Sequence, residues 1–411
     1  MIGLPRIGVD SLRHRGLLPA LLGLALSSFI LTACAPTMPP PKPSQPAPAP
    51  AAPAPAVQAP APAPVPVKEG TQVGLLLPLS GPQAGLGRSM LQAAEMGLFD
   101  VAGPDFDLVV RDSAAGGGPD GAARSALGEK ADIILGPLFG AELKQAAGPA
   151  MTARVPMVSF SNDTSAAQPG VFVLGITPES QVDRVVGYAA SQQLRRFAIM
   201  TPNSAYGRLV LSAYQEAVVR HGGSIAQIVF YDPQNPDMTI PVREIGEAYA
   251  RAPFDALMIP EGGQRLRAFA SMLPAFGLPP GVVRLLGTSL WQDSGTLAEG
   301  GLIGGWFAAT APDRWQSFAQ RYAALYGSAP DPRAGIVYDA VTLAVALSKS
   351  KEGGDFSAPR MTDPSGFAGV TGVFRLLPDG KSERALTVLE VVPGNFTVRD
   401  PAPASFAATI N

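Results

Sequence analysis

Short, unbroken apolar runs alternate with segments of helical periodicity through most of the chain, and this alternation restricts the fold more than any other feature. A first series of runs lies at 73–77, 108–110, 133–135 and 155–160, and a second at 197–200, 225–230, 256–259 and 285–286. Unbroken apolar runs suit strands that are buried on both faces of a parallel sheet. A strand followed by a helix, repeated in two series, predicts two α/β units with right-handed crossovers.

Residues 35–66, which precede these units, are largely proline and alanine. Proline fixes φ and removes a backbone donor, so this stretch cannot build regular helix or sheet. We expect 34–70 to form an extended, semi-rigid and disordered tether rather than a domain.

Cys34 is the only cysteine and closes the run Leu-Thr-Ala-Cys at 31–34. Before it lie a mostly apolar stretch at 17–30 and several arginines, an order typical of a secretory signal. The ending resembles the bacterial lipobox, which implies cleavage after residue 33 and lipidation of Cys34. A transmembrane helix is the alternative, but a span needs about 20 apolar residues, and this segment is shorter and contains proline and glycine.

Charge and residue usage exclude several classes of protein. The formal net charge is −2 and no basic stripe is present, so we expect no nucleic-acid partner. The two histidines are His14, in the predicted signal, and His221, which we interpret as a cation near the C-terminus of a helix. Serine- or cysteine-type triads and the usual zinc sets are therefore hard to build. We expect no metal, no cofactor and no enzyme, although a site built from carboxylates alone stays open.

The glycine-rich loop at 112–121 resembles a phosphate-binding loop only superficially. It lacks the Gly-Lys-Ser/Thr ending, so no lysine reaches a nucleotide phosphate. We expect an ordinary flexible loop in which Pro119 opens a helix.

Polar or aromatic residues follow many of the apolar runs. The candidate ligand residues are Ser80, Gly81, Gly140, Ser161, Asn162 and Asp163 in the first unit, and Tyr206, Glu261 and Trp291 in the second. Ligands of parallel sheets bind at the carboxyl ends of the strands. The recurrence of such residues in both units predicts one interlobe cleft and a two-lobed binding protein.

From about residue 73 to 392 the chain resembles the type I periplasmic binding proteins of the leucine-binding kind. The matching segments are VGLLLPLSGP at 73–82, IILGPL at 133–138, AYG at 205–207, FDALM at 254–258 and VYDA at 337–340. The resemblance implies two Rossmann-like lobes joined by three crossings. Lobe one would be 71–175 with 305–384, and lobe two 176–304 with 385–411. The helices expected in 306–350 would pack on lobe one.

Within this family, the segment LLLPLSG, the Phe-Ser-Asn-Asp turn at 160–163 and the lipobox followed by a tether look like the penicillin-binding-protein activator lipoproteins. That resemblance implies a non-catalytic periplasmic lipoprotein, anchored in the outer membrane through its N-terminal lipid, which stimulates a bifunctional peptidoglycan synthase. Larger members carry an N-terminal helical-repeat domain, which we do not expect here because the predicted tether leads directly to the binding-protein fold. The alternative is a receptor that delivers an amino-acid-like ligand to the permease of an ABC importer.

The resemblance also assigns roles to the candidate residues. Members that hold an α-carboxylate use a hydroxyl after the third strand, where Gly140 stands, and another after the fourth, where Asp163 stands. An alignment shifted by one residue would make Ser161 or Thr164 the relevant hydroxyl. Tyr206 and Glu261 match positions that face the ligand amine and backbone. Because Asp163 would repel a substrate carboxylate, we expect weak or absent binding of branched-chain amino acids.

Overall fold

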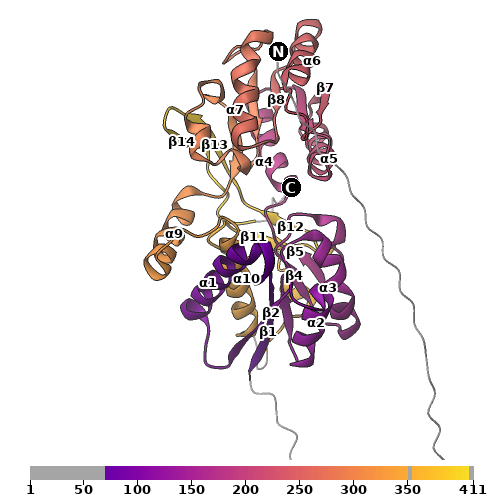
Figure 1. Ribbon diagram of the computed structural model, residues 1–411, viewed down its shortest axis with the longest axis vertical. Coiled ribbons are helices and arrows are strands. Elements are labelled where there is room, and N and C mark those ends of the chain that lie inside the picture. Colours follow the sequence, from indigo (N-terminus) through magenta and orange to yellow (C-terminus); the bar gives the residue numbers. More distant parts are fainter. Residues whose placement is uncertain (1–69, 350–353, 407–411) are drawn as a thin grey trace, which may run out of the picture. The chain divides into compact units, whose positions relative to one another are not determined.

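The computed structural model describes residues 70–349 and 354–406. The predicted signal peptide, Cys34 and almost all of the predicted tether lie outside the described residues. Within them, one parallel and one mostly parallel sheet form the two lobes, with helices on both faces of each sheet (Figure 1). This α/β architecture confirms the predicted fold class.

The first lobe is built on a five-stranded sheet of order β2-β1-β3-β4-β5, in which all pairings are parallel. Its strands are β1 (Thr71–Leu77), β2 (Phe106–Asp112), β3 (Ile133–Leu135), β4 (Met157–Ser159) and β5 (Val171–Val173). Its helices are α1 (Ala84–Val101), α2 (Gly118–Gly128), α3 (Gly140–Ala153) and α10 (Ala334–Ser348). Pro119 lies in the first turn of α2, as the sequence predicted.

The apolar runs form strands because both faces of the first sheet are covered. Leu75 and Leu77 of β1 pack in the core under α1 and α10, whereas Leu76 packs in the core under α2 and α3. Figure 1 shows these two helix pairs on opposite sides of the sheet. The alternate side chains of one strand therefore belong to two separate hydrophobic cores.

The second lobe has a seven-stranded sheet of order β14-β13-β10-β9-β8-β6-β7. Its strands are β6 (Arg196–Pro202), β7 (Ser224–Tyr231), β8 (Ala256–Met258), β9 (Arg284–Gly287), β10 (Trp306–Ala309), β13 (Thr387–Val392) and β14 (Asn395–Asp400). Its α-helices are α4 (Pro178–Ser191), α5 (Ala205–Arg220), α6 (Thr239–Arg251), α7 (Gly263–Met272) and α8 (Ser294–Leu297). Strands β6 to β10 pair in parallel, and β13 and β14 add antiparallel strands.

The chain passes between the two lobes after β5, after β10 and after β12. The segment between the last two passages contains α9 (Pro312–Tyr326), α10, α11 (Ala358–Met361), β11 (Phe374–Leu376) and β12 (Ser382–Arg384). Phe318 and Tyr322 of α9 are buried against α1 and α10 of the first lobe. The short 3₁₀ helices are η1 (Gly81–Gln83), η2 (Thr164–Ala166), η3 (Leu273–Phe276), η4 (Ser289–Trp291) and η5 (Gly300–Leu302).

One boundary of the predicted lobes is wrong. The sequence predicted that the chain returns to lobe one at residue 305 and forms helices in 306–350, but 306–309 form β10. This strand is hydrogen-bonded between β9 and β13, and all of its residues are buried in the second sheet. A four-residue strand is too short for periodicity to separate it from the start of a helix.

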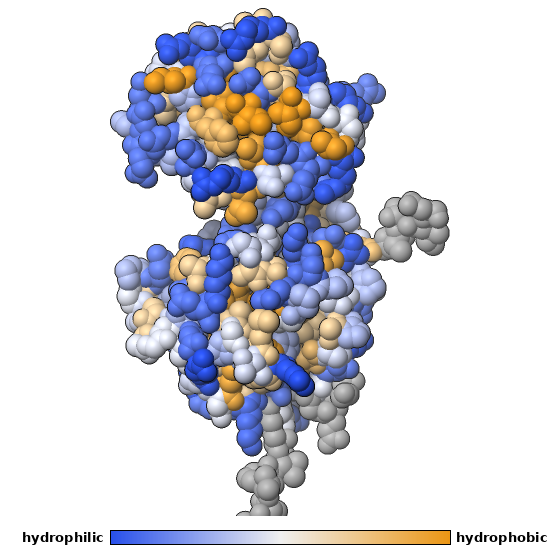
Figure 2. All heavy atoms as spheres, turned by 90° about the vertical axis from the view of Figure 1, so that its right-hand side faces the viewer, coloured by the Kyte–Doolittle hydropathy of each residue, from blue (hydrophilic) through white to orange (hydrophobic). Residues whose placement is uncertain are grey.

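Strand β7 forms one edge of the second sheet and carries an apolar surface. Figure 2 shows apolar residues gathered on this side of the lobe, in the upper half of the view. Phe230 on β7, Val219 on α5 and Ile240 on α6 are exposed large apolar side chains of this region. The edge of the sheet is thus flanked by apolar side chains rather than by a covering strand.

Candidate functional site

The loop after β1 is tied to the loop after β2 at the carboxyl end of the first sheet. The backbone N–H of Leu79 donates to Asp112 Oδ1 at 2.9 Å, and the N–H of Ser113 donates to the carbonyl of Leu77 at 2.8 Å. Burial opposes ionisation of Asp112, but hydrogen bonds from Ser80 and from backbone amides lower its pKa overall. The predicted ligand residue Ser80 therefore interacts with a carboxylate, and the exposed Gly81 next to it has a φ of +68°.

Gly140 and Asp163 lie against each other although they belong to different loops. Gly140 begins α3, and a Cβ atom added to it would lie 2.7 Å from Asp163 Oδ2 and 2.9 Å from Asp163 Cβ. The other carboxylate oxygen of Asp163 caps η2 by accepting from the N–H of Ser165 at 2.9 Å. A hydroxyl-bearing side chain at position 140 thus fits only if Asp163 moves. Gly140 and Asp163, which stand where amino-acid-binding members have hydroxyl residues, are therefore in contact with each other.

The hydroxyls near Asp163 already have partners within the protein. Ser161 is buried, and its Oγ accepts from the N–H of Asp163 at 2.9 Å. Thr164 Oγ1 donates to Glu179 Oε1 at 2.8 Å. Asn162 is exposed. The hydroxyls of Ser161 and Thr164, which a shifted alignment would select, are therefore both hydrogen-bonded within the protein.

The structure adds a third carboxylate to this edge of the first sheet, which sequence reasoning missed. Glu142 lies in the first turn of α3, and its Oε2 accepts from Ser113 Oγ at 3.3 Å. Burial raises the pKa of Glu142, and the charge of Asp112 raises it further. Glu142 could have been predicted as a residue of this edge, because it stands only two residues after the candidate Gly140. Asp112, Glu142 and Asp163 together make this edge acidic.

The second lobe presents a tyrosine–carboxylate cluster at the carboxyl ends of β6, β7 and β8. Glu261 Oε2 accepts from Tyr231 OH at 2.5 Å, and Oε1 accepts from the N–H of Gly262 at 3.1 Å. Arg265 Nε lies 3.7 Å from Glu261 Oε2. Tyr206, in the first turn of α5, has its OH 3.4 Å from Thr288 Oγ1.

The carboxylate of Glu261 contributes to the raised pKa of both tyrosines. Burial raises the pKa of Tyr206, and the negative charge of Glu261 adds to the increase. Burial, followed by the hydrogen bond to Glu261, raises the pKa of Tyr231 strongly. The predicted pair Tyr206 and Glu261 is therefore assembled in one place. Tyr231 and Arg265 belong to the same cluster and were not predicted.

The prediction that Trp291 faces a ligand is wrong. Its side chain is fully buried in the core of the second lobe, where Nε1 donates to the carbonyl of Ile259 at 3.0 Å. The short helix η4 turns the indole ring inward, although the residue follows a strand end as expected.

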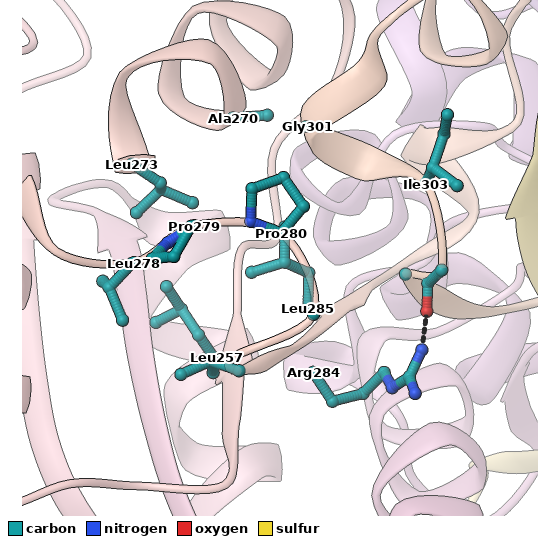
Figure 3. Close-up of a pocket in the computed structure, with 14 residues that line it drawn as sticks. Leu257, Ala270, Leu273, Leu278, Pro279, Pro280, Arg284, Leu285, Gly301 and Ile303 are labelled. Atoms are coloured by element: carbon teal, nitrogen blue, oxygen red, sulfur yellow. Dashed lines mark hydrogen bonds between the residues drawn. The ribbon is translucent and has the colours of Figure 1, made fainter. Parts of the chain in front are cut away.

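A small apolar pocket lies between the end of α7 and strands β8 and β9 (Figure 3). It has a volume of about 100 Å³ and is lined mainly by leucines, glycines and prolines, among them Leu257, Leu273 and Pro280. Arg284 lies at its side and donates to the carbonyl of Gly304. Binding sites for small molecules usually span about 300–1,000 Å³. None of the predicted ligand residues lines this pocket, so it is not the candidate site.

Between residues 70 and 406, apart from the gap at 350–353, no group of three potential metal ligands comes together. In the same part of the chain, no helix has the length and apolar character needed to cross a membrane. His221 ends α5, and its Nε2 lies 3.0 Å from Asp183 Oδ1.

The two-lobed fold, with polar clusters at the strand ends of both lobes, defines a binding-protein class. A family model for periplasmic binding proteins matches residues 70–395, so the chain belongs to this family. Membership implies a periplasmic protein and a fold that typically binds solutes rather than catalyses reactions. The predicted leucine-binding-like fold is confirmed. The match does not distinguish the activator subgroup from the other members of the family.

Solved structures of the same fold come from several bacteria. A putative branched-chain amino acid ABC transporter from Rhodospirillum rubrum has a TM-score of 0.70 at 21% identity, covering 80% of this chain and 99% of that one. The leucine-binding protein LivK from Thermotoga maritima has a TM-score of 0.58 at 18% identity, covering 81% and 98%. LivJ from Streptococcus pneumoniae, in complex with isoleucine, has a TM-score of 0.57 at 16% identity, covering 81% and 100%.

A relative of this chain is known in Rickettsia prowazekii. That protein is uncharacterized and is 24% identical over 166 residues, which is 40% of this chain and 44% of the relative. The chain thus matches less than half the length of this relative. At these identities, the similarities to solved structures establish the fold and not the ligand.

Proposed function

We propose that this protein is a periplasmic receptor for a small ligand that carries an amine or another cation. The observation that supports this function is the cluster of Glu261 with Tyr206 and Tyr231 at the strand ends of the second lobe. The side chain of Glu261 is held in place yet keeps 22% of its surface exposed. The similarity to transporter substrate-binding proteins supports a solute receptor as the general class.

The ligand in this proposal presents no free carboxylate to the first lobe. Asp112, Glu142 and Asp163 gather at its strand ends. A ligand carboxylate placed beside them would meet like charges in a partly desolvated site. The acidic edge and the Glu261 cluster both favour a cationic ligand over an α-amino acid.

Leucinamide and leucine test this proposal directly, because they differ only in the group that replaces the carboxylate. We expect leucinamide to bind more tightly than leucine in calorimetry with the purified protein. Glu261→Gln should weaken leucinamide binding roughly ten- to hundredfold, since a hydrogen bond to a charged group contributes about 1.5–3 kcal/mol. Glu244→Gln, on the exposed face of α6, is the matched control and should leave binding unchanged. Leucine binding as tight as leucinamide binding would contradict the proposal.

A second candidate function is activation of a bifunctional penicillin-binding protein. The contact between Gly140 and Asp163 favours it, because that contact removes the usual means of holding an amino acid in this fold. The sequence supports it through the lipobox at Cys34, whose lipidation would anchor the protein, and through the proline-rich tether. A polyproline-like chain rises about 3.1 Å per residue, so 34–70 would span on the order of 110 Å. Such a length suits an outer-membrane lipoprotein that reaches a synthase in the inner membrane.

Shortening the tether separates the two candidate functions. Under the activator hypothesis, deletion of 46–64 should leave the folded part intact and reduce the protein's effect on cell-wall synthesis in cells. An unrelated Pro/Ala segment of equal length should restore the effect, because the hypothesis requires only that the tether be long enough to reach the synthase. The measurement is incorporation of labelled peptidoglycan precursor. A deletion that is silent in this assay but abolishes growth on an amino acid as nitrogen source would favour the importer receptor instead.

A further inference from the structure

The strands at the edges of the two lobe sheets differ in how their free backbone is protected. An edge strand has unpaired N–H and C=O groups that another chain can bond, and proteins usually protect it with charges, proline, a bulge or a cover. The edge strands β2 and β14 both contain charged residues. The edge strand β5 has only three residues, and the N–H of Val173 at its end donates to the carbonyl of Gly380 at 2.8 Å.

Strand β7, the remaining edge, lacks these protections along most of its length. Its sequence, SIAQIVFY, contains no charged residue and no proline. Residues 225–228 are partly exposed, whereas every residue of the neighbouring β6 after Arg196 is buried. A bulge at Ala226 interrupts the pairing with β6. The regular part of this open edge is therefore 227–231.

The backbone groups of Ile228 and Phe230 point away from the sheet. The carbonyl of Tyr231 accepts from the N–H of Asn203, which follows β6, at 2.7 Å. Because successive residues of a strand turn their N–H and C=O groups to opposite sides, Tyr231 bonds toward β6, whereas Ile228 and Phe230 face outward. The carbonyl of Ile228 accepts from the side-chain amide of its neighbour Gln227 at 3.3 Å. This bond is longer than the usual range of about 2.7–3.2 Å, and a pairing strand can replace it.

Exposed apolar side chains flank this edge on both faces of the sheet. Phe230 is 46% exposed, and it lines a small hollow together with Ile240 in the first turn of α6. Val219, in the last turn of α5 on the other face, is 74% exposed. Figure 2 shows the apolar surface of this side of the lobe, surrounded by polar residues. Such a surface is typical of a protein–protein contact.

The two ends of the edge carry opposite charges. At the start of β7, Arg196 stands beside Ser224 in the register with β6, and Arg195 precedes it; both arginines are exposed. After the end of β7, Asp232 and Asp237 are exposed. A two-fold axis through the regular segment brings the start of one strand to the end of the other. The basic end of one copy then meets the acidic end of a second copy, so the edge is complementary to itself.

A charge of the opposite sign lies at each end, but it is bonded within the protein. At the start, the partly exposed carboxylate of Asp255 accepts from the backbone N–H of Arg196 at 2.8 Å. At the end, Arg265 donates to the carbonyl of Pro233 at 2.7 Å and lies 3.7 Å from Glu261 Oε2. These charges reduce the difference between the two ends and do not reverse it.

We infer that β7 pairs antiparallel with β7 of a second copy of this chain, in a dimer whose two-fold axis passes through Val229. In this register Ile228 of one copy lies opposite Phe230 of the other, and each such pair exchanges two N–H···O=C hydrogen bonds. The two sheets of the second lobes then form one continuous sheet. Because both copies use the same surface, the contact closes at two copies and leaves no open edge for a fibre.

Sedimentation velocity of the purified full chain over a range of concentrations should show a monomer–dimer equilibrium. Phe230→Lys should raise the dissociation constant roughly tenfold or more, because it places a charge on the apolar edge. Phe99→Lys is the matched control, since Phe99 is 84% exposed on α1 of the first lobe. It should leave the equilibrium unchanged.

Two further measurements test the orientation of the strands and the pairing of their backbones. Asp232→Arg should weaken the dimer, and the additional change Arg196→Glu should restore it, because antiparallel pairing brings these two ends together. Hydrogen exchange at the amides of residues 228 and 230 should become slower as the protein concentration rises. In Phe230→Lys the exchange should no longer depend on concentration.

The inference is overturned if the natural protein stays monomeric at all concentrations, if the dimer survives Phe230→Lys, or if Phe99→Lys dissociates it equally. A monomer whose 228 and 230 amides become protected only when an extended peptide of another protein is added would also overturn it, because the edge would then serve a different partner. The melting temperature shows whether each variant is folded. If Phe230→Lys does not fold, Asp232→Arg with and without Arg196→Glu decides the outcome.

Discussion

Replacing Asp339 by alanine should lower the free energy of unfolding by about 3–5 kcal/mol, which is the usual effect of breaking a buried ion pair. Asp339 on α10 has no exposed surface. Its Oδ1 accepts from the N–H of Val370 at 2.6 Å, and its Oδ2 accepts from the N–H of Thr371 at 3.1 Å and lies 3.6 Å from Arg384 Nη1. Urea denaturation of the purified protein measures the change.

The effect should be large because the substitution leaves the guanidinium of Arg384 buried without its counter-charge. Burial raises the pKa of Asp339, while the charge of Arg384 and the hydrogen bonds from Thr371 oppose that increase. The double change Asp339→Ala with Arg384→Met should recover part of the loss, since it removes both charges. Asp313→Ala, at an exposed position in the first turn of α9, is the matched control. A loss below about 1 kcal/mol for Asp339→Ala would show that the pair does not hold this region together.

Exchanging Gly140 and Asp163 together for serine should create binding of leucine, which we expect the natural protein to bind weakly or not at all. The double substitution supplies the hydroxyls that the resemblance assigns to these positions. It also removes Asp163, the one carboxylate of the acidic edge that stands at a ligand-binding position. A hydrogen bond to a charged group contributes about 1.5–3 kcal/mol, or roughly one to two decades of affinity. Calorimetry with leucine, isoleucine and valine measures the gain.

The single substitutions should behave differently, and this difference tests the contact itself. Gly140→Ser alone should lower the melting temperature, because its Cβ would lie 2.7 Å from Asp163 Oδ2. The loss should disappear once Asp163 is also serine. Gly103→Ser is the control, since a Cβ at this exposed glycine meets nothing within 4 Å. Micromolar leucine binding by the natural protein would contradict the assignment of Gly140 and Asp163.

The strand ends were predictable from sequence because residues buried on both faces of a sheet must be apolar, so each apolar run ends where polar residues begin. This is why Ser80, Gly140, Asp163 and Glu261 were placed after the correct strands. The three-residue β5 and the four-residue β10 were missed. The equally short β3, β4, β8 and β9 were predicted because each belongs to the regular alternation of strand and long helix, whereas no long helix precedes β5 or β10.

The sequence by itself determined the alternation of strands and helices, and hence the fold family, because periodic burial is a local pattern. Only the tertiary structure decided which side chains meet. The contact of Gly140 with Asp163, the inward turn of Trp291 and the buried pair of Asp339 and Arg384 each join residues from separate loops or elements. Such contacts depend on how loops and helices pack in three dimensions, and packing at this distance along the chain leaves no periodic signal in the sequence.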